Sequence, residues 1–178
     1  MPNILHRFSI DAPPERVHQL AVTREGIQLW WTGHPVAGDD ELGGRLSVYF
    51  SDNGQPAASF EVVERSPAQI VWRCVSGPGD WLDTRIAFAL EPRADGGTTL
   101  VFSHEGRRQE NEFMNACSTN WAAYLMSLKS GAEGRGFNAF AGGEMSRESA
   151  RSAPRAARDT GEAPATARAD ELDDDIPF

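Results

Sequence analysis

The chain has 178 residues, enough for one domain of about 135 residues with a core of its own. Its formal net charge of −9 argues against a folded surface that binds nucleic acid directly, because phosphate binding needs a surplus of Lys and Arg. We see neither a secretory signal nor the roughly 18 apolar residues that a membrane span needs, so we expect a cytoplasmic protein with no membrane partner.

The chain begins with a segment in which apolar and polar residues alternate. Residues 4–10 have a period of two, which predicts a strand. A helix should follow from Pro14, since proline fits the first turn of a helix. Thr23 is placed to cap a second short helix, which carries the adjacent tryptophans Trp30 and Trp31.

The middle of the chain has the pattern of a sheet. Residues 33–44 are rich in glycine and acids and predict a loop. Alternating segments then follow, separated by turn sequences, at residues 45–50, 58–64, 70–75, 86–90 and 100–104. Four or five strands joined by short turns predict an antiparallel meander.

A long helix is predicted over residues 110–130, which contain no proline or glycine. Large side chains recur there at steps of three or four, at Phe113, Cys117, Trp121, Tyr124 and Leu128. A helix of about 20 residues is near 30 Å long, and one with a broad apolar stripe packs on the apolar face of a sheet. The predicted fold class is therefore α+β.

Beyond this helix the composition changes. Residues 143–169 contain one large apolar residue, Met145, and so bury too little surface to offset their ordering entropy. We predict a flexible linker with a root-mean-square reach near 30 Å. The expected organisation is a domain over residues 1–140, a disordered linker over 141–169 and an acidic docking peptide over 170–178.

Several short motifs resemble those of a known family. They are Ile10-Asp11-Ala12-Pro13-Pro14-Glu15-Arg16-Val17, Trp30-Trp31-Thr32, Gly43-Gly44-Arg45, Gly96-Gly97-Thr98-Thr99-Leu100, Ser103-His104-Glu105-Gly106 and Gly134-Arg135-Gly136. In this order they resemble the START-like SRPBCC superfamily, and within it the AHSA-like branch, named for the activator of the heat-shock chaperone ATPase. The resemblance implies a helix-grip fold, in which a curved sheet wraps around the C-terminal helix and leaves a cavity. Members bind hydrophobic ligands or catalyse cyclisation or dehydration of polyketide-like substrates, so the fold implies a pocket rather than one reaction.

The implied cavity has aromatic candidates for its wall. The candidate ligand-binding residues are Trp30, Trp31, Trp72, Phe88, Phe102, His104, Cys117 and Trp121. Each tryptophan ring can bury roughly 150–250 Å², so these rings would form a wall for a small apolar molecule. The alternative is that the rings fill an ordinary core.

His104 is the one candidate for a catalytic residue. It shares a strand face with Leu100 and Phe102, and a carboxylate at Glu61 or Glu112 would let it act as a proton donor or base. The alternative is a hydrogen-bonded core histidine. Cys74 and Cys117 are far apart in the sequence, each among apolar residues. The sequence also has no Ser-His-Asp order, no phosphate-binding loop and no cluster of metal-binding residues, so no metal or cofactor is expected.

The chain ends in an unusual acidic peptide, Asp173-Asp174-Asp175-Ile176-Pro177-Phe178. It closely resembles the terminal peptide of bacterial single-stranded DNA-binding protein, which docks genome-maintenance proteins. Phe178 would enter an apolar pocket while its carboxylate meets an arginine and the aspartates pair with a basic rim. A solubilising acidic tail is the alternative, although it does not explain the terminal aromatic residue.

Three functions remain open from the sequence. The favoured one is a small-molecule binding domain that its C-terminal peptide brings to replication or repair proteins. The second is a cyclase- or dehydratase-like enzyme that uses His104. The third is a chaperone-linked interaction protein.

Overall fold

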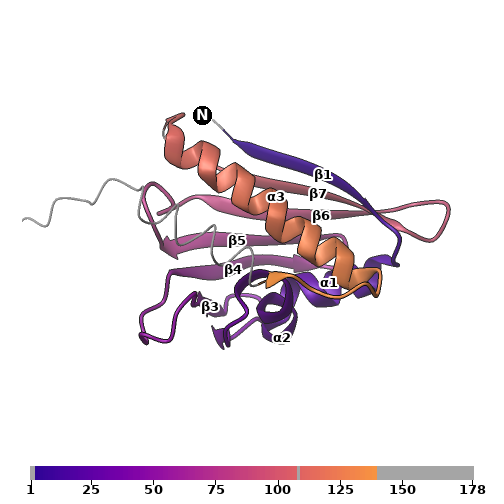
Figure 1. Ribbon diagram of the computed structural model, residues 1–178, viewed down its shortest axis with the longest axis horizontal. Coiled ribbons are helices and arrows are strands. Elements are labelled where there is room, and N and C mark those ends of the chain that lie inside the picture. Colours follow the sequence, from indigo (N-terminus) through magenta and orange to yellow (C-terminus); the bar gives the residue numbers. More distant parts are fainter. Residues whose placement is uncertain (1–2, 108, 140–178) are drawn as a thin grey trace, which may run out of the picture.

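The structure is a computed structural model that describes residues 3–107 and 109–139 (Figure 1). Its elements in chain order are β1 (Ile4–Ile10), α1 (Pro14–Val22), α2 (Arg24–Ile27), the π-helical turn η1 (Gln28–Thr32), β2 (Ala37–Gly38), β3 (Arg45–Val48), β4 (Ala58–Ser66), β5 (Gln69–Ser76), β6 (Arg85–Pro92), β7 (Thr98–Glu105) and α3 (Glu112–Ala132). The strands form one antiparallel sheet in the order β1-β7-β6-β5-β4-β3-β2. The predicted linker and docking peptide lie outside the described residues.

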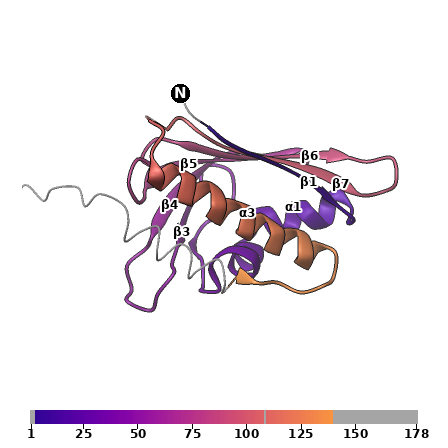
Figure 2. The ribbon, with the colours of Figure 1, turned by 45° about the horizontal axis from the view of Figure 1, so that its top comes forward.

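The sheet bends around α3, which confirms the predicted α+β helix-grip class. Figure 1 shows α3 crossing one face of the sheet, and in Figure 2 strands β3 and β4 turn down from the layer of β1, β6 and β7. The short helices α1 and α2 lie beside the lower end of α3 (Figure 1). The helices therefore lie on the concave face of the sheet.

Two features enlarge the predicted meander. Strand β1 pairs with β7 from Ile4 opposite His104 to Ile10 opposite Thr98, so the first strand becomes an edge of the same sheet. The two-residue strand β2 lies within the segment that we expected to be a loop, and it pairs with β3. The result is seven strands instead of a separate first strand and a meander of four or five.

Both ends of α3 lie two residues later than predicted. Asn111 caps the start, because its side-chain oxygen accepts a hydrogen bond from the backbone N–H of Met114 at 2.8 Å. The helix runs through Gly131, where we had expected it to end. A Cβ at Gly131 would lie 1.9 Å from the ring of Phe137, so this glycine allows a close contact, and Gly134 with φ of +78° follows the helix.

Local signals at the second helix agree with the prediction. The hydroxyl of Thr23 accepts a hydrogen bond from the Gly26 N–H at 3.0 Å, as expected of a capping residue. In the π-helical turn that follows, both Trp30 and Trp31 are buried, with stacked rings 5.7 Å apart. The Trp30 indole donates to the Leu20 carbonyl at 2.9 Å, which fixes the turn against α1.

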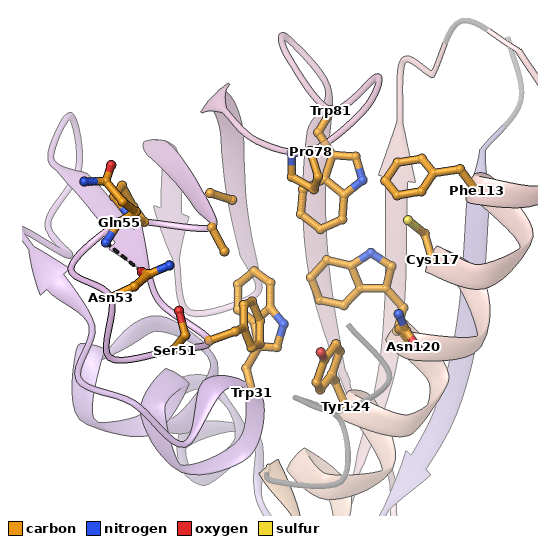
Figure 3. A pocket seen from close by; sticks show the side chains of 15 residues that line it. Trp31, Ser51, Asn53, Gln55, Pro78, Trp81, Phe113, Cys117, Asn120 and Tyr124 are labelled. Atoms are coloured by element: carbon orange, nitrogen blue, oxygen red, sulfur yellow. Dashed lines mark hydrogen bonds between the residues drawn. The ribbon is translucent and has the colours of Figure 1, made fainter. Parts of the chain in front are cut away.

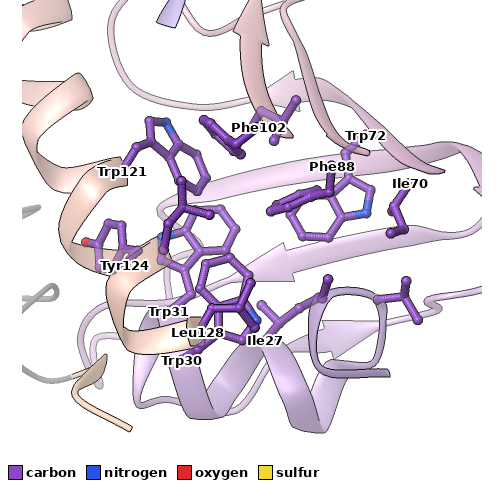
Figure 4. Close-up of a cluster of buried hydrophobic side chains, with 14 of the residues drawn as sticks. Ile27, Trp30, Trp31, Ile70, Trp72, Phe88, Phe102, Trp121, Tyr124 and Leu128 are labelled. Carbon is purple, nitrogen blue, oxygen red and sulfur yellow. The ribbon is translucent and has the colours of Figure 1, made fainter. Parts of the chain in front are cut away.

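Aromatic rings form the centre of the core (Figure 4). Trp31 lies 4.9 Å from Trp121 of α3 and 6.1 Å from Trp72 of β5. Trp121 in turn lies 4.6 Å from Phe102 of β7. These contacts join the π-helical turn, the sheet and α3 into one cluster. Within residues 3–107 and 109–139, no helix has both the length and the apolar content to cross a membrane.

We predict that Leu128→Ala lowers the free energy of unfolding by about 2–5 kcal/mol, because it leaves a cavity at a fully buried position of α3. Met126→Ala on the same helix is the control, since Met126 is 49% exposed and its loss should cost below about 0.5 kcal/mol. Urea unfolding followed by circular dichroism measures both values. Equal losses in the two variants would contradict the packing of α3 described above.

Candidate functional site

A cavity of about 360 Å³ lies at one end of α3 (Figure 3). Its walls come from α3, from the π-helical turn, and from the loops that follow β3 and β5. Six aromatic side chains line it, at Trp31, Phe50, Trp81, Phe113, Trp121 and Tyr124. Polar groups at Ser51, Asn53 and Gln55 lie together on the loop side (Figure 3). Such a wall suits a small molecule with an apolar body.

Three of the eight candidate ligand-binding residues line this cavity: Trp31, Cys117 and Trp121. The other five, Trp30, Trp72, Phe88, Phe102 and His104, lie buried in the adjoining core and do not line it. Their rings pack on one another, as in the contact of 5.0 Å between Trp72 and Phe88. The inner face of β5, β6 and β7 is thus filled by rings, and the space opens toward the loops.

The sequence analysis missed the loop residues of the wall. Trp81 follows Gly77-Pro78-Gly79-Asp80, one of the turn sequences between the predicted strands. A Cβ at Gly79, where φ is +56°, would lie 2.4 Å from the Phe113 ring, so the glycine lets this turn approach α3. A tryptophan within a glycine- and proline-rich turn was the available signal, because exposed turns are usually polar.

His104 lies within a directed chain of hydrogen bonds. The Trp121 indole N–H can only donate, so it makes His104 Nδ1 the acceptor at 3.2 Å. His104 Nε2–H then donates to the Thr84 hydroxyl at 2.8 Å, and that hydroxyl donates to the Trp81 carbonyl at 2.5 Å. The chain sets the tautomer of His104 and links α3, β7 and the turn that carries Trp81.

The environment of His104 favours the neutral ring. Burial lowers its pKa to about 3, and the positive charge of Arg107 acts in the same direction. Neither Glu61 nor Glu112 is among the hydrogen-bond partners of the ring in the described residues; Glu61 instead pairs with Arg73, which is exposed. The arrangement matches the hydrogen-bonded core histidine that we gave as the alternative to catalysis.

A buried ion pair lies beside the cavity. The Arg107 side chain is completely buried, and its Nη2 donates to Asp80 Oδ1 at 2.6 Å. The same nitrogen is 3.9 Å from the sulfur of Cys117, and the guanidinium carbon is 5.5 Å from the centre of the Phe113 ring. Burial raises the pKa of the Cys117 thiol, whereas Arg107 and Trp81 oppose that rise. No sequence pattern indicated this pair, because its members are 27 residues apart.

The comparisons with known proteins agree with this geometry. The family model described as Activator of Hsp90 ATPase homolog 1-like protein matches residues 11–133, more than half of the chain. The chain belongs to this family. The match includes the whole aromatic cluster and both partners of the Arg107–Asp80 pair.

Solved structures show the same fold. The solution structure of the Aha1 dimer from Colwellia psychrerythraea is 32% identical, with 75% of this chain and 97% of that chain covered and a TM-score of 0.65. Crystalline CalU16 from Micromonospora echinospora is 21% identical, with 84% of each chain covered and a TM-score of 0.60. The structure of PFC0360w, an HSP90 activator from Plasmodium falciparum, is 17% identical, with 71% and 92% covered and a TM-score of 0.60. A comparison with curated proteins finds no match.

We predict a pH dependence of stability that belongs to His104. Its folded pKa of about 3 lies below the ordinary value of 6.5, so between these values the unfolded chain binds a proton that the folded chain does not. This contribution to stability is complete above pH 6.5, and from pH 7 to pH 5 it should fall by about 2 kcal/mol.

The His104→Gln variant tests this prediction, because glutamine can keep both hydrogen bonds without titrating. Urea unfolding of both proteins at pH 7, 6 and 5 should show a smaller loss in the variant. His18, whose pKa burial also lowers, contributes equally to both proteins and cancels in the comparison. Identical pH slopes would refute a buried, neutral His104.

Proposed function

We propose that this domain binds a small molecule with an apolar or aromatic body in the cavity beside α3. The observation that carries the proposal is the wall of six aromatic side chains around a space of about 360 Å³. That volume is near the lower end of the roughly 300–1,000 Å³ typical of small-molecule sites. Trp31, Cys117 and Trp121 would contact the ligand directly, while Trp30, Trp72, Phe88, Phe102 and His104 would support the wall from behind.

A chaperone-linked interaction is the second candidate. Its support is the similarity to two structures that are described as an Aha1 dimer and an HSP90 activator. An interaction of this kind needs no ligand in the cavity, so the two candidates differ in what the cavity does. An enzymatic role for His104 has less support, because both ring nitrogens are bonded within the core.

We predict that Phe50→Ala weakens binding of an apolar fluorescent or aromatic probe about tenfold, a change of about 1.4 kcal/mol, because it removes one ring from the wall. Phe8→Ala is the matched control, since Phe8 is also a partly buried aromatic residue but does not line the cavity. Titration of tryptophan fluorescence measures the affinity. A panel of apolar compounds without any response from the wild-type protein would favour the chaperone-linked candidate.

We further propose that the chain end, Asp173 through Phe178, docks a genome-maintenance protein. The support is the sequence itself, which combines three aspartates with a terminal Ile-Pro-Phe. The apolar residues Ile176, Pro177 and Phe178 suit an apolar pocket, and the aspartates suit a basic rim that speeds encounter. The domain over residues 1–140 would then be tethered to its partner by residues 141–169.

A labelled peptide of residues 170–178 should bind a protein that recognises the tip of single-stranded DNA-binding protein with micromolar affinity, about 8 kcal/mol. Removal of Phe178 should abolish most of this binding, and added salt should weaken the remainder. Fluorescence anisotropy measures both effects. Unchanged affinity of the shortened peptide would reject docking and leave the solubilising tail as the interpretation.

Both proposed activities fit a cytoplasmic protein. Cys74 and Cys117 are free and buried, and unpaired thiols suit a reducing compartment.

A further inference from the structure

Arg107 has unused hydrogen-bonding capacity in a completely buried position. Its guanidinium has five N–H groups, and within the described residues its Nε and Nη1 have no hydrogen-bond partner. The ion pair with Asp80 uses Nη2 alone. Buried donors of a charged group that lack acceptors are costly, so an acceptor that reaches them is strongly favoured.

A second unpartnered donor lies close to the first. The indole nitrogen of Trp81 is buried and has no hydrogen-bond partner of normal geometry within residues 3–107 and 109–139, although it lies close enough to the Cys117 sulfur to oppose the rise in the pKa of that thiol. Trp81 lines the cavity, and in Figure 3 its nitrogen is directed toward the side of Phe113 and Cys117. Two donor side chains, one of them cationic, thus lie at the same end of the cavity, with Trp81 in its wall and Arg107 behind it.

This donor group lies directly behind the cavity wall. Cys117 and Phe113 both line the cavity, and both contact the Arg107 guanidinium. Phe113 is the second residue of α3, whose first turn adds the positive end of a helix dipole. The opposite side of the cavity is made by loop residues such as Asn53 and Gln55.

We propose that the ligand of this cavity is a small carboxylic acid whose carboxylate binds Arg107 and Trp81. This inference rests on the proposed ligand-binding function and names the chemical class of the ligand. Its apolar body would lie against Trp31, Trp121 and Tyr124. The Phe113 ring would turn aside, so that the carboxylate accepts a hydrogen bond from an unpaired N–H group of Arg107, at Nε or at Nη1, while Asp80 keeps its bond to Nη2.

A carboxylate fits this end better than a neutral oxygen. A carboxylate accepts charge-assisted hydrogen bonds from arginine, and such bonds are about twice as strong as neutral ones. Asp80 balances the charge of Arg107 in the free protein, but it accepts a hydrogen bond through one oxygen from one nitrogen. Several N–H groups therefore remain for a ligand.

Isothermal titration calorimetry with a matched pair of probes tests the proposal on the wild-type full chain. 1-Naphthoic acid and 1-naphthamide share an apolar body and differ in the charged group. At pH 7.5 the acid should bind at least about tenfold more tightly than the amide. In a ¹⁵N spectrum, the Arg107 Nε–H and Trp81 indole signals should shift with the acid.

Variants then assign the preference to Arg107. The double variant Arg107→Gln/Asp80→Asn removes both charges together, so no unpaired charge is left buried, and it should bind the two probes equally. The control Arg7→Gln/Glu91→Gln removes an exposed ion pair between β1 and β6, in which Arg7 Nη2 lies 3.0 Å from Glu91 Oε2. This control should keep the tenfold preference for the acid over the amide.

Each outcome decides between the two proposals. Equal affinity of the wild-type protein for acid and amide overturns the carboxylate inference but leaves the ligand-binding function standing. Failure of both probes to bind overturns both. A preference for the acid that survives in the folded double variant also overturns the assignment to Arg107. The same holds if naphthoate binds without a shift of the Arg107 Nε–H signal. If the double variant does not fold, the ¹⁵N spectrum of the wild-type protein decides.

Discussion

The structure depends on the way Trp121 is held. Its ring packs between Trp31 and Phe102, with ring centres 4.9 Å and 4.6 Å away, and its N–H begins the hydrogen-bond chain through His104 and Thr84. One residue of α3 is thereby bonded both to the sheet and to the turn that carries Trp81. Because the indole N–H can only donate and the Trp81 carbonyl can only accept, the chain has a single direction.

This constraint also explains where the cavity lies. The rings on the inner face of β5, β6 and β7 pack against one another and are buried, so they occupy the centre of the sheet. The cavity lies where loops instead of strands face α3, between Phe50, Trp81 and that helix. The fold thus supplies an aromatic base, and its loops supply the rest of the wall.

Polar groups beside the cavity divide into two kinds. His104 has both ring nitrogens bonded and a lowered pKa, so it acts as a structural bridge. Arg107 is equally buried, yet most of its donors are unpaired, and it lies behind Cys117 and Phe113 of the wall. Satisfied groups stabilise the core, whereas unsatisfied ones indicate where a ligand would gain most.

Most elements and the fold class were predictable from the chain alone, because local periodicity and capping depend on near neighbours. Examples are the strand at residues 4–10, the cap at Thr23 and the apolar stripe of α3. The sequence also named three of the residues on the cavity wall, Trp31, Cys117 and Trp121. The tertiary structure alone decided which rings fill space and which border it. It also paired Arg107 with Asp80 and His104 with Trp121, since such contacts join residues that are distant in sequence and leave no local pattern.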